Sequence, residues 1–158
     1  MVAPSHHRTY PFAFDPHYSV AGRLFGIEPR SAYVAVADGR LVARFGPWLV
    51  DTPVQNVGRM ALTGPFSTLR TIGPARPSGR DRGLTFATNA DSGLCLSFGE
   101  PVRGIDPLGL LRHPGLTVTV AEPEALAEAV VRAQATEVGR KAPSEVEIDL
   151  RTTRNTRV

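Results

Sequence analysis

The chain has 158 residues, of which 42% are hydrophobic and 21% are charged. These are the proportions of an ordinary folded domain, so wholesale disorder is excluded and one domain with a sizeable core is expected. Its net charge is +3, and 17 of its 18 basic residues are arginine. We attribute this imbalance to codon usage in a GC-rich genome, so it is no evidence for a nucleic-acid partner.

No stretch of the chain approaches the ~20 apolar residues that a membrane span requires. The first 30 residues carry several charges and contain no apolar run long enough for a signal-peptide core. The single cysteine, Cys95, cannot form a disulfide within the chain, which is compatible with a reducing compartment. The sequence therefore predicts a cytoplasmic protein.

Residues 1–30 predict an irregular N-terminal lead-in. The first nine residues are polar, and aromatic and aliphatic residues then return between Tyr10 and Ile27. Pro11, Pro16 and Gly22 interrupt this second stretch, so we expect it to pack on the domain without forming a regular element.

The clearest local signal is a hairpin. Two strand-like runs, 32–37 and 40–45, are separated by Asp38 and Gly39. An Asp-Gly pair tolerates the positive φ angles of a type I′ turn. A third strand is predicted over 48–52.

Further short strands follow, at 58–63, 84–88, 94–98 and 116–120. We expect the runs 84–88 and 94–98 to pair as a second hairpin. Residues 99–114 are rich in proline and glycine and predict a long irregular connection.

A helix is predicted to close the domain. Pro123 suits its first position, and Gly139 is a candidate C-cap. Leu126, Val130 and Ala133 recur at helical spacing, so one face of the helix is expected to pack on a sheet.

Residues 139–158 form a C-terminal tail in which 145–150 alternate acidic and apolar residues. This pattern is strand-like, and its apolar residues Val146, Ile148 and Leu150 are candidates for pairing with a sheet edge of this chain or of a partner. A disordered tail is the alternative.

The predicted order of elements resembles the pleckstrin-homology-like domain, including its bacterial versions. It begins with a hairpin, has about seven short antiparallel strands and ends with a helix. Residues 118–126 look like the strand-to-helix junction of bacterial members. The chain is also similar to actinobacterial proteins of unassigned function through 44–48, 83–89 and 112–118. The resemblance implies an α+β, mostly β fold, in which residues 31–138 form a partly open barrel capped by the helix.

Lipid-binding members of that family hold a head group with basic residues on an open loop between their first two strands. In this chain the corresponding connection is the tight turn at Asp38 and Gly39. The departure argues against a membrane partner.

No phosphate-binding glycine loop, nucleophile elbow or zinc-binding helix motif occurs, and neither a cofactor nor a metal is predicted. Basic residues on two connections are candidates for binding an anion, although solvated loops are the alternative. The first of these connections, residues 70–82, contains no aromatic residue on which a base could stack. This argues against binding of single-stranded nucleic acid. The anion-binding candidates are Arg70, Arg76, Arg80, Arg82, Arg112 and His113.

These observations favour a non-catalytic binding or interaction module for a protein partner or an anionic ligand. The alternative is an enzyme of unrecognised type, with His113 and Arg112 near a pocket lined by Trp48.

Overall fold

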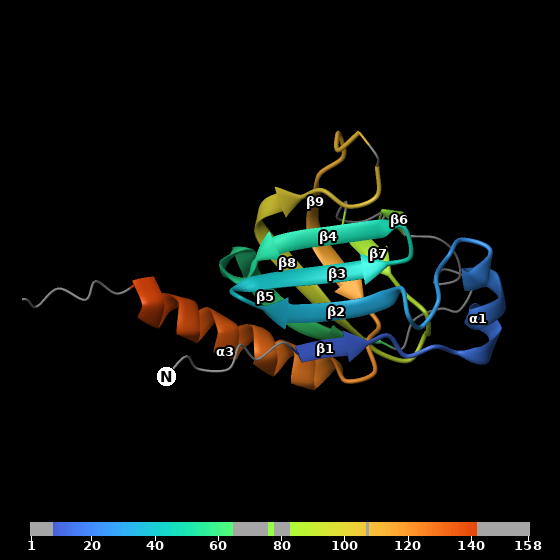
Figure 1. The fold of residues 1–158 in the computed structure, drawn as a ribbon, viewed down its shortest axis with the longest axis horizontal. Helices are drawn as coiled ribbons and strands as arrows, with labels where there is room; N and C mark the ends of the chain where they lie inside the picture. The colour runs from blue at the N-terminus through green and yellow to red at the C-terminus, as the bar shows by residue number, and fades with distance from the viewer. Residues whose placement is uncertain (1–7, 65–75, 78–82, 107, 142–158) are drawn as a thin grey trace, which may run out of the picture.

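The computed structural model describes residues 8–64, 76–77, 83–106 and 108–141. In these parts of the chain strands predominate and form two sheets, accompanied by a short N-terminal helix and a long C-terminal helix (Figure 1). The fold is therefore α+β and mostly β, as the sequence predicts. No described helix is both long and apolar enough to cross a membrane.

The first sheet is entirely antiparallel and follows the order of the chain. Its strands are β1 (Arg8–Pro11), β2 (Ala32–Ala37), β3 (Arg40–Phe45) and β4 (Trp48–Pro53). The predicted hairpin and third strand are thus confirmed. Strand β1 was not predicted, and it lies in the segment expected to be irregular.

The turn between β2 and β3 has the predicted geometry. Asp38 has a φ of 49° and Gly39 a φ of 71°, which are the positive values of a type I′ turn. A Cβ atom on Gly39 would lie 2.7 Å from Cδ of Glu137. The positive φ of the turn therefore favours glycine here, whereas the end of the Glu137 side chain could move aside for a Cβ atom.

The second sheet has the order β5-β8-β9-β7-β6 and is mixed. A 3₁₀ turn, η1, leads into it. These elements are η1 (Val54–Asn56), β5 (Val57–Thr63), β6 (Arg76–Pro77), β7 (Leu84–Phe86), β8 (Gly93–Val102) and β9 (His113–Val118).

The predicted second hairpin is wrong, because β9 lies between β7 and β8 and pairs in parallel with β7. The cause is Asn89 in the connection between β7 and β8. Its Nδ2 donates to the carbonyl oxygens of Ala13 (2.8 Å) and Thr119 (3.3 Å), and its Oδ1 accepts from the amide of Asp91 (3.0 Å). The two bonds that Asn89 donates tie the connection to distant segments, whereas the bond from Asp91 is local.

Helix α1 (Pro16–Arg23) is a second element of the expected irregular lead-in. Asp15 caps it, since its Oδ1 accepts a hydrogen bond from the amide of His17 at 3.0 Å, and Pro16 occupies a first-turn position that needs no hydrogen-bond donor. The lead-in does pack on the domain as predicted, because Tyr10 and Ile27 belong to the core.

Helix α3 (Pro123–Lys141) begins where the sequence predicts but does not end at Gly139. No atom lies within 4 Å of a Cβ built on Gly139, so no packing forces the chain to turn there. The ion pair between Glu137 and Arg140, at 3.0 Å, spans this glycine and supports the last turn.

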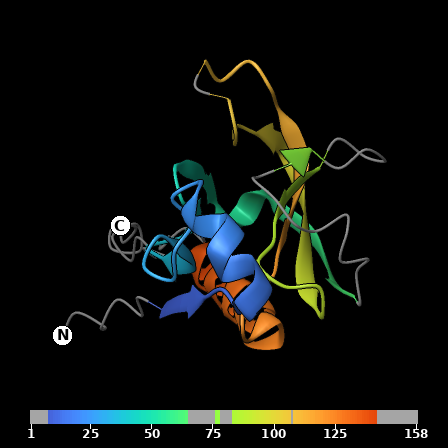
Figure 2. The same ribbon diagram turned by 90° about the vertical axis from the view of Figure 1, so that its right-hand side faces the viewer.

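The core lies between the two sheets, with α3 across one open side (Figure 2). Phe45 of the first sheet stacks on Phe86 of the second with ring centroids 4.9 Å apart and planes inclined by 6°, and its ring centroid lies 5.2 Å from that of Phe12. Leu126 and Val130 of α3 are fully buried in the same cluster. The predicted packing of one helical face on a sheet is confirmed.

The described strands do not form a closed barrel. They number nine rather than about seven, and one pair is parallel rather than antiparallel. A single isolated bridge between Phe12 and Val120 connects the segments that follow β1 and β9. Backbone hydrogen bonds also join the two sheets, from the amide of Ala13 to the carbonyl oxygen of Thr119 (3.0 Å) and from that of Asp15 to the carbonyl oxygen of Thr88 (3.1 Å), and core side chains pack between them.

Candidate functional site: a groove beside an edge strand

A groove of about 730 Å³ lies where the two sheets diverge, between β4 and the end of β8. Its lining comes from five parts of the chain that are distant in sequence. The lining residues are Gly39, Leu49, Asp51, Thr52, Pro53, Gln55, Asn56, Glu100, Pro101, Val102, Arg103, Arg112 and Glu137.

Strand β4 forms one wall of the groove and ends the first sheet, so no described strand pairs with its outer edge. The amide of Val54 donates to the carbonyl oxygen of Gly39 at 2.9 Å, so these two residues form a hydrogen-bonded pair. The register of β4 with β3 then shows which residues of β4 bond to β3. Antiparallel pairs alternate, so the backbone groups of Val50 and Thr52 point toward β3. Those of Leu49 and Asp51 point toward the groove.

Asn56 joins the two walls. Its Nδ2 donates to Oγ1 of Thr52 and to the carbonyl oxygen of Glu100, both at 2.9 Å, and its Oδ1 accepts from the amide of Glu100 at 2.7 Å. A single side chain therefore sets the spacing between β4 and β8 at the base of the groove.

Helix α3 holds the adjoining 3₁₀ turn in place. Nε2 of Gln134 donates to the carbonyl oxygens of Val54 (2.8 Å) and Val57 (2.7 Å), and Nε2 of Gln55 donates to the carbonyl oxygen of Gln134 (2.9 Å). One turn further on, Glu137 reaches the groove. The C-terminal helix thus leads directly to one end of the site.

The charges of the groove are unequally paired. Asp51 forms an ion pair with Arg40 at 2.7 Å, and Glu137 forms one with Arg140 at 3.0 Å. Within the described ranges, Arg103 and Arg112 form no ion pair. The groove therefore presents two guanidinium groups and the carboxylate of Glu100, none of which has an ion-pair partner in the described parts of the chain.

The two guanidinium groups are placed by backbone contacts. Nη1 of Arg112 donates to the carbonyl oxygen of Pro101 at 3.3 Å. The side chain of Arg103 lies along Gly109, where an added Cβ would be 3.0 Å from Cδ of the arginine. Since a guanidinium has five N–H donors, most of the donors of Arg112 are available to an incoming acceptor.

The structure separates the two adjacent residues that the sequence analysis combined. Arg112 is exposed and lines the groove, as befits an anion-binding candidate, whereas His113 is only 3% exposed. His113 is the first residue of β9 and lies opposite Val102, so the expectation of a loop histidine is wrong. Arg112 lies just before the strand, where its side chain is exposed, whereas His113 enters the sheet.

Trp48, which was predicted to line a pocket, does not line this groove. Trp48 packs near Phe45, with ring centroids 6.4 Å apart, and Arg76 belongs to the short strand β6. The remaining candidates lie outside the described residues: Arg70, Arg80, Arg82, Val146, Ile148 and Leu150.

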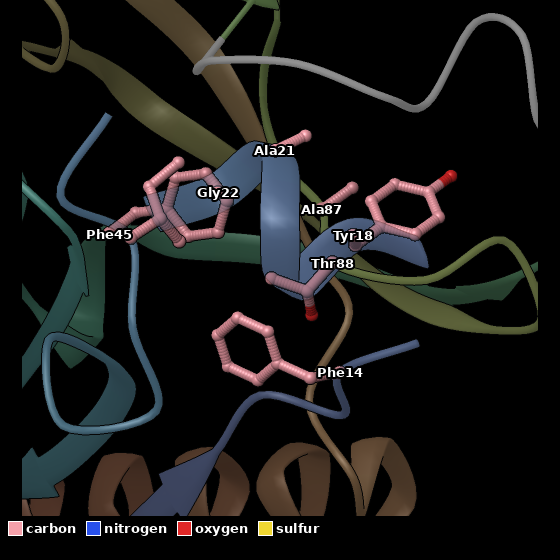
Figure 3. A pocket seen from close by; sticks show the side chains of 8 residues that line it. Phe14, Tyr18, Ala21, Gly22, Phe45, Ala87 and Thr88 are labelled. Carbon is pink, nitrogen blue, oxygen red and sulfur yellow. The ribbon is translucent and has the colours of Figure 1, made fainter. Parts of the chain in front are cut away.

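A second hollow lies beneath α1 (Figure 3). Most of its lining is apolar, and its free volume is about 10 Å³. This is room for at most about one water molecule. We interpret it as a packing gap. Its lining residues are Phe14, Tyr18, Ala21, Gly22, Ile27, Phe45, Ala87 and Thr88.

Within the described parts of the chain, no group of three or more His, Cys, Asp or Glu side chains is placed to hold a metal ion. Comparisons with protein-family models, curated proteins and solved structures gave no match for this chain. The case for a function therefore depends on the groove itself.

Proposed function

We propose that this protein is a non-catalytic binding module whose groove beside β4 receives an extended, acidic segment of a protein partner. The observation that carries the proposal is the coincidence of two guanidinium groups with a strand edge that pairs with no described strand. The outward backbone groups of Leu49 and Asp51 supply the edge, and Arg103 and Arg112 supply the charge.

Each half of this arrangement has a defined role. A peptide that adds as a strand gains affinity from main-chain hydrogen bonds, and its alternate side chains give specificity. Arginine binds carboxylates through two parallel hydrogen bonds and adds directional preference. Leu49 is 49% exposed and offers an apolar contact in the same groove, so a segment alternating acidic and apolar residues suits the site.

The enzyme alternative loses its main support. It required His113 and Trp48 to share a pocket with Arg112, and of these three residues only Arg112 lines the groove. We therefore propose no reaction.

Membership of the pleckstrin-homology-like family, kinship with the actinobacterial group and cytoplasmic location remain predictions. Two sheets with a C-terminal helix are compatible with the family resemblance. The parallel pairing of β7 with β9 and the additional helix α1 depart from the pattern that the resemblance implies.

The proposal can be tested by selecting short random peptides displayed on a surface against the immobilised full chain. We expect enrichment of sequences that alternate acidic with apolar residues. Affinity should fall about tenfold or more in an Arg103→Ala/Arg112→Ala variant. The matched control, Arg23→Ala/Arg59→Ala, removes two exposed arginines that do not line the groove and should bind like the parent chain.

N-methylation of a selected peptide at alternate amides separates strand addition from simple charge attraction. One of the two alternating patterns should abolish binding, because it blocks the amides that face β4, and the other should leave it intact. Selection of basic peptides, or equal loss in both arginine variants, would contradict the proposal.

A further inference from the structure

The groove has a potential occupant in the same chain. Residues 145–150, Glu-Val-Glu-Ile-Asp-Leu, alternate three acidic with three apolar residues. We infer that this segment adds to the outer edge of β4 as an intramolecular strand, so that an external partner must displace it. The displacement rests on the proposed function, whereas the docking of the segment does not.

The charge pattern of the segment complements that of the groove. In an extended strand, Glu145, Glu147 and Asp149 lie on one face and the apolar residues on the other. The groove offers Arg103 and Arg112 without ion-pair partners among the described residues. Its own acidic groups compete weakly, because two of the three carboxylates in its lining already pair with an arginine.

The apolar half of the segment also finds a counterpart. Leu49, Pro53 and Pro101 are exposed residues that line the groove. Covering such surface contributes roughly 25 cal/mol for each Å² of apolar area removed from water. Main-chain bonds to the outward groups of Leu49 and Asp51 would fix the segment in register.

The chain can reach the groove. Glu137 of α3 lines the groove near the end of β4. It lies close to Gly39, and the carbonyl oxygen of Gly39 accepts a hydrogen bond from the amide of Val54, the residue that follows β4. Helix α3 ends at Lys141, about 6 Å further along its axis at 1.5 Å per residue. Residues 142–158 span up to about 55–60 Å when extended, which is ample for a return.

The direction of approach is favourable as well. A segment that enters beside Pro53 and continues toward Trp48 runs antiparallel to β4, and antiparallel pairing is the more stable arrangement per residue. The connection from α3 is short, so the effective concentration of the segment at its own groove is in the range of about 1 mM. Docking within one chain is therefore favoured over docking between two copies.

Amide hydrogen exchange, measured by NMR on the full chain, tests this inference. A variant with Ile148→Pro/Asp149→Pro removes the donors on both edges of the proposed strand. We expect the amides of Leu49 and Asp51 to exchange at least about tenfold faster in this variant than in the parent chain. The amides of Val50 and Thr52, which point toward β3, should exchange equally slowly in both.

A second variant provides the control. Asn155→Pro/Thr156→Pro places the same two prolines beyond the segment and should leave the amides of Leu49 and Asp51 as slow as in the parent chain. Protection that is unaffected by Ile148→Pro/Asp149→Pro would overturn the inference. Protection that rises with protein concentration would overturn it too, because a second copy would then supply the strand.

The two proposals fail in different ways. If the outer amides of β4 exchange rapidly in every chain but selected acidic peptides still bind at Arg103 and Arg112, the tail docking is wrong and the proposed function stands. If the tail protects these amides but no peptide binds to the Ile148→Pro/Asp149→Pro variant, the docking stands and the proposed function is wrong.

Discussion

The hollow beneath α1 and the groove beside β4 differ in what surrounds them. The hollow beneath α1 is largely apolar, and the side chains around it leave only about 10 Å³. The groove beside β4 has about 730 Å³ and is bordered by charged side chains and by a strand edge whose backbone groups lack a described partner. Apolar surfaces close together because burial is favourable, whereas hydrated charges and backbone groups keep a surface open. We therefore expect the first region to contribute to stability and propose that the second serves recognition.

The largest effect is expected at the aromatic stack that adjoins the hollow beneath α1. Phe45 is 1% exposed and stacks on Phe86 at 4.9 Å. Phe45→Ala should lower the free energy of unfolding by about 3–5 kcal/mol, as measured by urea denaturation. Phe25, which is 45% exposed, is the matched control, and Phe25→Ala should cost less than about 1 kcal/mol. Equal costs at the two positions would contradict the assigned core.

The next effect concerns the two faces of α3. Leu126 is fully buried, whereas Val131 is 54% exposed. Leu126→Ala should destabilise the protein by about 2–5 kcal/mol, and Val131→Ala should stay within about 0.5 kcal/mol of the parent chain. Thermal unfolding followed by circular dichroism measures both. A small effect at Leu126 would mean that the helix does not complete the core.

A smaller effect should follow from removing the link across the base of the groove. Asn56→Ala deletes three hydrogen bonds to Thr52 and Glu100, at a cost of about 1–3 kcal/mol. Peptide affinity should fall as well, since the spacing of the two walls is no longer fixed. Ser19→Ala, which removes one hydrogen bond to the Pro16 carbonyl in α1 and does not change the lining of the groove, is the control and should leave affinity unchanged. Unaltered affinity in Asn56→Ala would argue against a preorganised groove.

The smallest effect on stability is expected at the groove arginines. Arg103→Ala/Arg112→Ala should change the free energy of unfolding by no more than about 0.5 kcal/mol, although it weakens peptide binding. Binding to the parent chain should also weaken as salt rises, because the Debye length falls from about 10 Å at 0.1 M to about 3 Å at 1 M. Affinity that is independent of salt would show that the arginines are not the recognition groups.

The sequence predicted the elements whose signals are local. The turn at Asp38 and Gly39, the start of α3 at Pro123 and the buried face through Leu126 and Val130 each depend on residues a few positions apart. The capped helix α1 carried a local signal that was missed, namely Asp15 followed by Pro16.

The remaining features depend on contacts between distant residues. Asn56 bonds to Glu100, Asn89 bonds to Ala13, and Gln134 bonds to Val54. Nothing adjacent to these amide side chains in sequence indicates which backbone groups they satisfy. The parallel pairing of β7 with β9 and the position of Arg103 in the groove follow from such contacts, so neither was predicted.

The most direct test is an NMR titration of the Ile148→Pro/Asp149→Pro chain with the peptide Glu-Val-Glu-Ile-Asp-Leu. We expect the amide signals of Leu49, Asp51, Arg103 and Arg112 to shift, while those of Tyr18 and Ala21 in α1 stay in place. Shifts confined to Tyr18 and Ala21, or no shifts at all, would contradict the assignment of recognition to the groove beside β4.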